Sequence, residues 1–292
     1  MPYIHFIVNP ISGKGKHEIT TSYIKSFFPN ESYTIEVDYT EYKNHATELT
    51  KIAIEANPDC IVACGGDGTI NEIASCLIGT DIKLGIVPVG SGNGLAANLK
   101  IPKELSKSLD LIKNGTALAI DAGKVNEHCF FSNMGIGIDA LIIKNYEQSG
   151  KRTLISYIIS ALAASLEFKP TKTMISLNDK LIVDNPFMLF VSNSNEMGYG
   201  MSLTPKASLS DGLLDLVIIP SLSFREKLLL GYYVLRNKTD QFKKSQHFLL
   251  NKLHLELPEK IFPDIQIDGE YHSFKTTTIE ISILPKALQV II

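Results

Sequence analysis

The chain has little net charge, few cysteines and no long apolar run. Its 292 residues carry a formal net charge of −3, so no basic surface indicates a nucleic-acid partner. The four cysteines lack the paired spacing of a zinc site, and we expect them to be reduced thiols. No run of about 18 apolar residues predicts a membrane-spanning helix, and the first residues lack the basic start of a signal peptide. With 45% apolar residues, the sequence predicts a cytoplasmic protein with one large or two ordinary domains.

The most informative stretch is an apolar strand that enters a glycine turn, residues 60–72. The three glycines of Gly65-Gly66-Asp67-Gly68 carry no Cβ atom that would hold a ligand away from the backbone. A helix expected at about 70–77 would point its free N–H groups at the turn, which favours an anion such as phosphate. Asp67 would repel phosphate unless a cation such as Mg²⁺ lies between them or Asp67 faces a reacting hydroxyl. The turn therefore predicts phosphoryl transfer from a nucleotide. The alternative is a plain turn in which Asp67 caps the helix.

Two further glycine turns follow apolar strands. A strand at 3–8 enters the turn 9–16, which contains Lys14 and Lys16, and a strand at 83–89 enters the turn 89–94. The first turn lacks Walker A spacing, but it can wrap phosphates through N–H groups with lysine charge beside them; the alternative is a flexible surface loop. With further helices expected at 18–28 and 45–56 and a strand at 33–39, strand, turn and helix repeat four times. This predicts a parallel sheet with all three turns at its carboxyl edge, where such folds bind ligands.

From about residue 117 the pattern changes to a series of strands. They are expected at 117–121, 129–133, 173–177, 185–192, 213–219, 247–257, 264–267, 276–284 and 288–292. This predicts a second, mainly β domain, as a sandwich or an open barrel. Two helical stretches, 151–168 and 224–236, interrupt it. Either could border an apolar cleft or contact a membrane surface, and the alternative is that they cover the sheet.

The second half contains several acids that could carry chemistry. In Asp268-Gly269-Glu270 two carboxylates can share the work of taking a proton from a hydroxyl, or the segment can be a plain hairpin turn. The segment 208–213 places Asp211 among free carbonyls, which suits a hard cation, or it is only a turn. Asp121 and Asp139 are further acids that could equally be cap or turn residues.

Taken in order, these motifs resemble the diacylglycerol kinase catalytic-domain superfamily of lipid kinases, in particular its bacterial soluble members and the sphingosine kinases. The motifs are Val8–Gly13, Gly65–Glu72, Pro88–Asn93, Ser210–Gly212 and Asp268–Glu270, which span nearly the whole chain. The resemblance implies a parallel-sheet nucleotide-binding α/β domain like that of NAD kinases and phosphofructokinases, at 1–120 and completed by 284–292. It also implies a C-terminal β-sandwich lipid-binding domain at 121–283, with lipid entering near the cleft between the domains.

The resemblance further implies ATP and Mg²⁺ as cofactors and a residue for each role. ATP would contact Asn9, Pro10, Ile11, Ser12, Gly13, Thr40, Gly65, Gly66, Asp67, Gly68, Thr69, Ile70, Asn71 and Ser91. Glu270 would accept the proton of a lipid hydroxyl, with Asp268 beside it, and Asp67 and Asp121 would lie near the catalytic metal. Asp211 and the carbonyls of Ser208 and Leu213 would hold a structural Mg²⁺.

The chain departs from the bacterial pattern at one position. Bacterial diacylglycerol kinase-like members usually carry an Asn-Asp pair after the third glycine turn, whereas Gly94 follows Asn93 here, as in the sphingosine kinase version. The acceptor is therefore open between a diacylglycerol-like and a sphingoid lipid. Two alternatives remain, a kinase of a soluble acceptor of the NAD kinase type and a lipid-binding protein without catalysis. We expect a cytoplasmic enzyme that associates peripherally with membranes, and the β domain offers edge strands for a homodimer.

Overall fold

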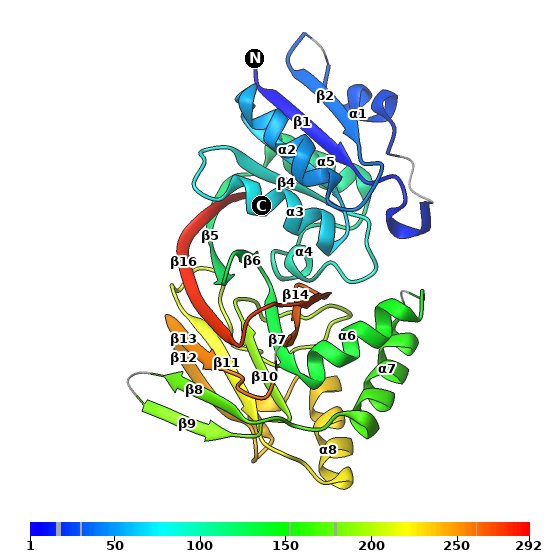
Figure 1. Cartoon of the computed structure of the whole chain (residues 1–292). Helices are drawn as coiled ribbons and strands as arrows, with labels where there is room; N and C mark the ends of the chain where they lie inside the picture. The colour runs from blue at the N-terminus through cyan, green and yellow to red at the C-terminus, as the bar shows by residue number, and fades with distance from the viewer. Residues whose placement is uncertain (16–18, 30, 152, 178–179, 261) are drawn as a thin grey trace. The chain divides into compact units, whose positions relative to one another are not determined.

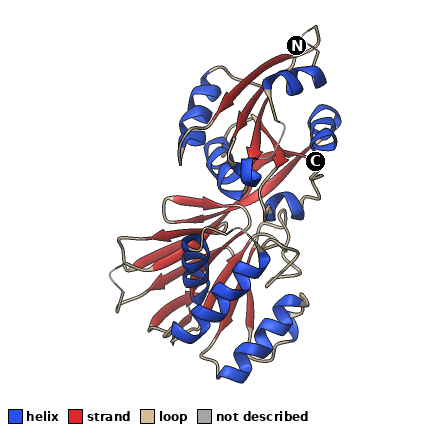
Figure 2. Ribbon diagram, turned by 90° about the vertical axis from the view of Figure 1, so that its right-hand side faces the viewer, coloured by secondary structure: helices blue, strands red, loops and turns tan. Residues whose placement is uncertain are grey.

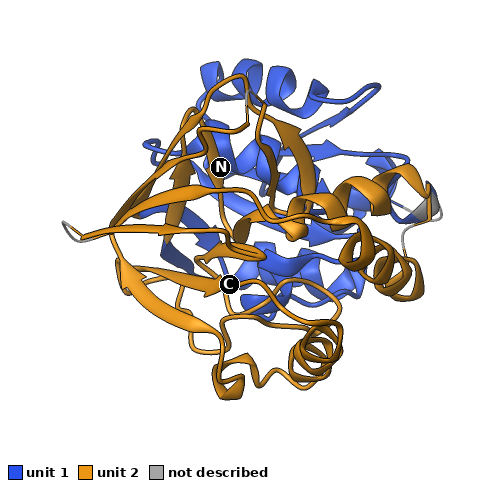
Figure 3. Ribbon diagram, turned by 60° about the horizontal axis from the view of Figure 1, so that its bottom comes forward, with its two compact units in different colours: residues 1–120, 286–292 blue, residues 121–285 orange. Residues whose placement is uncertain are grey.

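Two units make up the chain, and they differ in their sheets. The computed structural model describes residues 1–15, 19–29, 31–151, 153–177, 180–260 and 262–292. Unit 1 comprises residues 1–120 and 286–292, and unit 2 comprises residues 121–285 (Figure 3).

Unit 1 is built on a parallel sheet. β1 (Tyr3–Val8) lies between β2 (Thr34–Tyr39) and β3 (Cys60–Gly65), and β4 (Lys83–Pro88) lies beside β3. All of these pairs are parallel, and the end of β16 (Thr278–Ile291) adds a further parallel strand next to β4. Every residue of β3 is buried, as in a central strand that is covered on both faces.

Helices cover both faces of this sheet (Figure 2). α1 (Thr21–Phe27) and α5 (Leu105–Asn114) share one apolar core with alternate residues of β1. α2 (His45–Glu55) and α3 (Asp67–Leu77) pack on each other and against β1 and β3. A short 3-10 helix η1 (Ser12–Gly15) and α4 (Gly94–Asn98) belong to the turns after β1 and β4.

Unit 2 contains an antiparallel β-sandwich. One sheet has the order β12-β11-β10-β7-β14-β15. Its strands are β7 (Asn133–Gly137), β10 (Met188–Ser192), β11 (Leu214–Ile219), β12 (Gln246–Leu250), β14 (Asp264–Ile267) and β15 (Glu270–Ser273). The other sheet contains β16 with β5 (Ala117–Val125), β6 (His128–Phe130), β13 (Lys252–Glu256), β8 (Thr173–Leu177) and β9 (Lys180–Asp184). Apolar residues of both sheets form one core between them.

A helical layer covers the outer face of the first sheet of unit 2. It consists of α6 (Ile138–Gln148), α7 (Leu154–Glu167) and α8 (Phe224–Leu235), and the 3-10 helix η2 (Thr239–Gln241) follows α8 (Figure 1). The alternation of β10 explains this arrangement, because Leu189 and Val191 enter the sandwich core whereas Met188 and Phe190 pack under the helices. Strand β10 is therefore apolar at both faces.

The predicted fold class, a parallel α/β domain followed by a β-sandwich, is confirmed, but several elements differ. The expected strand 247–257 is two strands, because the chain leaves one sheet and enters the other at Asn251. The expected strands 276–284 and 288–292 are one strand, since β16 continues through Lys286, which has a φ of 51°. The expected strand 129–133 falls on β6 and the start of β7. Helices α5 and α6 and strands β9 and β15 were not predicted.

The expected helices keep their places; four of them are shorter than expected and α3 is longer. α3 starts at Asp67 rather than at Ile70, so Asp67 lies in the first turn of the helix. The start of the helix expected at 18–28 falls partly outside the described residues, since Glu18 is not described. All four cysteines are free thiols. Within the described parts of the chain, no helix has the length and apolar character needed to cross a membrane.

Candidate active site

Three turns of unit 1 meet at the carboxyl edge of the parallel sheet. They follow β1, β3 and β4, which are neighbours in one parallel sheet. The Asn9 N–H donates to the Cys64 carbonyl at 2.9 Å, and the Val89 N–H donates to the Gly65 carbonyl at 3.0 Å. The Asn9 Nδ2 also donates to Thr69 Oγ1 at 3.0 Å. These bonds hold the three turns together before any ligand is present.

The glycines of these turns serve the packing of the turns on each other. A Cβ atom on Gly90 would lie 2.6 Å from the Gly66 Cα, and one on Gly65 would lie 2.5 Å from the Thr69 Cβ. Gly13 has a φ of +59°, and a Cβ there would lie 2.5 Å from the Val89 carbonyl oxygen. The sequence suggested that these glycines give a ligand access to the backbone. The structure adds a second reason, because larger residues would push the turns apart.

Asp67 connects two of the turns. Its Oδ2 accepts the Asn93 N–H at 2.8 Å, and its Oδ1 accepts the Gly94 N–H at 2.7 Å. The carboxylate therefore caps the start of α4 rather than its own helix. Gly94, the position of the departure from the bacterial pattern, is thus a direct partner of Asp67. A carboxylate oxygen has two lone-pair directions, so accepting an N–H group does not by itself prevent it from meeting a cation.

The other predicted ATP contacts differ in accessibility. Ile11 is 80% exposed, and Ser91 is also exposed. Thr40 is buried and its N–H donates to the Val8 carbonyl, which places it at the end of β2. The Ile70 side chain is 2% exposed in the apolar interior, so only its backbone is available to a ligand. Lys16 lies outside the described residues, and the structure does not describe the side chain of Lys14.

In unit 2, Asp268 lies in the tight turn of the β14–β15 hairpin, and Glu270 directly follows this turn. Asp268 and Gly269 have φ values of 46° and 81°, as in a two-residue hairpin turn. The Asp268 carboxylate accepts three backbone N–H groups, from Phe131, Ser132 and Asn133, at 2.8 to 3.0 Å. Asp268 therefore ties the hairpin to the segment before β7, and Glu270 follows as the first residue of β15.

A buried polar network around Gln266 holds this hairpin in place. The Gly269 N–H donates to Gln266 Oε1 at 2.9 Å, and Gln266 Nε2 donates to Asn133 Oδ1 at 2.8 Å. Gln266 also bonds to the Asp139 carboxylate at the start of α6. Burial raises the pKa of the Asp139 carboxyl to about 6, and the bond from Gln266 partly offsets that rise.

Sequence reasoning did not identify Gln266 or the role of α6. The available signal was the alternation of β14, in which a glutamine stands between two inward isoleucines. Gln266 is 2% exposed, and a buried amide needs partners. The Asn133 side chain and the Gly269 N–H are two of these partners, and Asp139 at the start of α6 is a third. Glu147 of the same helix accepts the Tyr271 N–H at 3.0 Å. Gly135 leaves room for this arrangement, because a Cβ there would lie 2.0 Å from Asp139 Oδ2.

The predicted structural metal ligands lie on one loop before β11. Asp211 Oδ1 accepts the Leu213 N–H at 3.1 Å, and Asp121, a buried acid, accepts the Gly212 N–H at 2.7 Å. Burial, and secondly the nearby Asp211 carboxylate, raise the pKa of Asp215 to about 6. Asp211 and Asp215 are close enough for their charges to interact, and carboxylate oxygens are the donors that a hard cation such as Mg²⁺ prefers. Within the described part of the chain, no cluster of three or more His, Cys, Asp or Glu residues forms a metal site.

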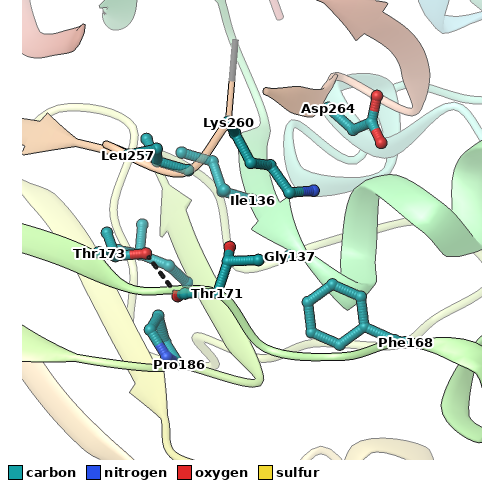
Figure 4. Close-up of a pocket in the computed structure, with 10 residues that line it drawn as sticks. Ile136, Gly137, Phe168, Thr171, Thr173, Pro186, Leu257, Lys260 and Asp264 are labelled. Atoms are coloured by element: carbon teal, nitrogen blue, oxygen red, sulfur yellow. Dashed lines mark hydrogen bonds between the residues drawn. The ribbon is translucent and has the colours of Figure 1, made fainter. Parts of the chain in front are cut away.

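A small cavity in unit 2 contains none of these residues. Its volume is about 10 Å³, which is roughly the space of one water molecule. Figure 4 shows Phe168 at one end and Lys260 and Asp264 at the other. The cavity is too small for a lipid headgroup, so we do not assign the acceptor to it.

Comparison with known proteins gives consistent matches along the chain. Residues 3–125 match the family model of the diacylglycerol kinase catalytic domain, and residues 132–292 match that of the YegS C-terminal NAD kinase beta sandwich-like domain. The chain is 30% identical to the diacylglycerol kinase of Bacillus subtilis (strain 168) over 93% of this chain and 90% of the relative. It is 28% identical to a probable lipid kinase YegS-like of Klebsiella pneumoniae (strain 342), over 96% and 93%.

A solved structure supports the same fold. The crystal structure of a putative diacylglycerol kinase from Bacillus anthracis str. Sterne superposes with a TM-score of 0.81, over 99% of this chain and 94% of that one. At 22% sequence identity, this likeness concerns the fold alone.

Proposed function

Because the chain belongs to the diacylglycerol kinase and YegS-like family of lipid kinases, we propose that it transfers the γ-phosphoryl group of ATP, with Mg²⁺, to a lipid hydroxyl. The acceptor is a diacylglycerol-like or sphingoid lipid. Family membership favours this activity over a soluble acceptor of the NAD kinase type and over a lipid-binding protein without catalysis. The observation that carries the proposal is the set of three turns held together at the carboxyl edge of the parallel sheet, with Asp67 between two of them.

The turns of unit 1 bind the nucleotide in this proposal. Free N–H groups of the turns after β1, β3 and β4 face the phosphates, and the first turn of α3 adds its N–H groups. The exposed Ile11 side chain offers an apolar surface to the base or ribose. Hydrogen bonds among the turns fix their shape in advance, so little ordering is needed when ATP binds.

The hairpin turn of unit 2 supplies the base. Glu270 takes the proton of the lipid hydroxyl while that oxygen attacks the γ-phosphorus, and the bond to the β,γ-bridging oxygen breaks to release ADP. Asp268 is a positioning residue, because its carboxylate is occupied by three backbone N–H groups. Most of the rate enhancement then comes from alignment of the two substrates and neutralisation of charge.

Mg²⁺, when bound, neutralises charge on the transferring phosphoryl group. Asp67 lies nearest to the nucleotide turns and is the proposed contact of the catalytic ion. The loop of Ser208, Asp211 and Leu213 holds a second, structural ion. Asp121 is hydrogen-bonded to that loop and supports it.

The test is transfer of labelled γ-phosphate from ATP with Mg²⁺ to separate mixed micelles of diacylglycerol, monoacylglycerol, sphingosine, ceramide and phosphatidylglycerol, with NAD as a soluble acceptor. One labelled lipid, lost in Asp67→Ala and in Glu270→Gln, supports the proposal and identifies the headgroup. Labelled NAD without labelled lipid, or ATP binding without any transfer, would contradict it. Glu270→Gln with unchanged turnover would contradict the assignment of the base.

We propose that the enzyme acts from the cytoplasm as a peripheral membrane protein, since its acceptor resides in a bilayer. For a homodimer, β9 is the proposed contact, because it ends its sheet and exposes Leu181 and Val183. Light scattering of the parent and of Leu181→Glu tests this. A dimer that persists unchanged in the variant excludes the β9 contact.

A further inference from the structure

Helix α7 of unit 2 has an inverted amphipathic pattern. Its exposed face carries Ile155, Ile158, Ile159, Leu162 and Leu166, spaced three, four, seven and eleven residues from the first. Its buried face carries Ser156, Ser160 and Ala164. Residues 154–166 contain no charged side chain. A surface helix normally turns its large apolar residues inward. An exposed apolar face of this kind therefore indicates a contact with an apolar partner rather than with water.

Helix α8 adds a second exposed apolar stripe. It consists of Phe224, Leu228, Leu229, Tyr232 and Leu235, whereas Leu230 packs inward. The two helices are neighbours on the same core, and the Lys227 ammonium donates to the Ser165 carbonyl of α7 (Figure 1). We call the exposed residues of both stripes the α7–α8 face.

Basic residues flank this face. Residues 151–172 contain four lysines or arginines and one glutamate, and residues 221–238 contain the same numbers. Together the two segments carry a net charge of +6, whereas the whole chain carries −3. Arg236 lies over the ring of Tyr232, with its Cζ 5.8 Å from the ring centroid, so one positive charge is in contact with the stripe. The acid Glu226 is already paired with Lys244 and Ser223.

We propose that the α7–α8 face is the membrane-docking surface of this lipid kinase, with its apolar side chains among the acyl chains and its basic side chains among anionic headgroups. The inference rests on lipid phosphorylation as the function. An apolar stripe with lysine and arginine around it is the pattern of a helix that lies in a bilayer interface. Each basic residue near an anionic leaflet adds to the attraction.

Charge also argues against a second copy of the chain as the partner. A symmetric contact would bring the same surface of two copies together, and each copy would contribute a net charge of +6 from these segments. An anionic lipid surface has the opposite charge. The lipid surface is therefore the occupant that the face fits.

The first measurement is cosedimentation with vesicles of equal parts phosphatidylcholine and phosphatidylglycerol, without nucleotide. The double variant Ile159→Glu/Leu162→Glu places two charges on the exposed stripe, where they leave the core intact. We expect its vesicle dissociation constant to rise at least about tenfold. Ile52→Glu changes a residue of α2 that is 64% exposed in unit 1, and it should bind vesicles like the parent. Parent binding should weaken with added salt and on vesicles of phosphatidylcholine alone.

The second measurement separates docking from chemistry. With a short-chain diacylglycerol below its aggregation concentration, the double variant should phosphorylate as fast as the parent, whereas on vesicles it should be slower by a similar factor of about ten. Vesicle binding unchanged in the double variant overturns the docking proposal. The docking proposal is also overturned if the double variant loses a dimer that the parent forms but still binds vesicles. If the parent binds vesicles but phosphorylates neither a diacylglycerol nor a sphingoid lipid, the proposed function fails while docking stands.

Discussion

The buried carboxyl of Asp139 predicts a specific dependence of stability on pH. Asp139 is 2% exposed, and its Oδ2 is buried without a hydrogen-bond partner. Burial raises the pKa of this carboxyl from 3.8 to about 6, although a bond from Gln266 opposes the rise. The substitution Asp139→Asn keeps the shape and the bond to Gln266 but removes the ionisation.

The magnitude follows from the difference in pKa between the folded and the unfolded chain. The folded state binds the proton more tightly, so it is favoured while Asp139 is protonated. This contribution is complete below the unfolded pKa and is lost as pH rises through about 6. The rise in pKa corresponds to about 3 kcal/mol of unfolding free energy lost by neutral pH. In Asp139→Asn the new NH₂ group lacks an acceptor, which costs about 1 to 2 kcal/mol at every pH.

The assay is urea unfolding at pH 5 and pH 8, followed by circular dichroism because the chain has no tryptophan. We expect the parent to lose about 1.4 kcal/mol more than Asp139→Asn between these pH values, because part of the contribution is already lost at pH 5, and we expect the variant to be slightly more stable at pH 8. Asp81→Asn, an exposed acid, is the matched control and should follow the parent. If Asp139→Asn has the same pH dependence as the parent, the buried carboxyl is not its source.

Three further predictions concern the candidate site. In Gly90→Ala the new Cβ would lie 2.6 Å from the Gly66 Cα, so ATP should bind about 10- to 100-fold more weakly by calorimetry, while Gly231→Ala, which has open space, should bind normally. Mg²⁺ should raise the melting temperature of the parent more than that of Asp211→Asn, which keeps only the ion proposed at Asp67; an equal rise in both would exclude Asp211 as a ligand. Asp268→Asn should lose about 3 kcal/mol of stability together with turnover, because the carboxylate accepts three N–H groups, whereas Glu270→Gln should lose turnover alone. Equal stability of the last two variants would contradict the positioning role of Asp268.

Local sequence patterns predicted the parts of the fold that depend on neighbouring residues. The alternation of apolar strands with glycine turns in the first half gave the parallel sheet and the edge where its turns meet. The sequence could not indicate that Gly66 and Gly90 touch, because that contact joins turns 24 positions apart and depends on strand order. The sequence identified these glycines correctly as part of the site, but it did not show that they also allow the turns to pack closely on each other.

Long-range partners explain what could not be predicted in the second half. Asp268-Gly269 signalled a hairpin, but Asp268 accepts N–H groups from residues about 135 positions earlier, which no local pattern reveals. Helix α6 was missed because its apolar residues and the preceding Gly-Ile-Gly-Ile run resemble a strand ending. β12 and β13 are separate strands because the chain turns at Asn251, where it leaves one sheet and enters the other.

Strand β16 has a consequence for the order of synthesis. Its first part pairs with β13 in unit 2, and its last residues pair with β4 in unit 1. During translation an N-terminal domain usually folds while the rest of the chain is still being made. Here the parallel sheet of unit 1 lacks a strand until β16 has been synthesised, so the edge of β4 in the nascent unit 1 stays unpaired until then. A chain shortened by its final seven residues, 286–292, would remain in that unfinished state permanently.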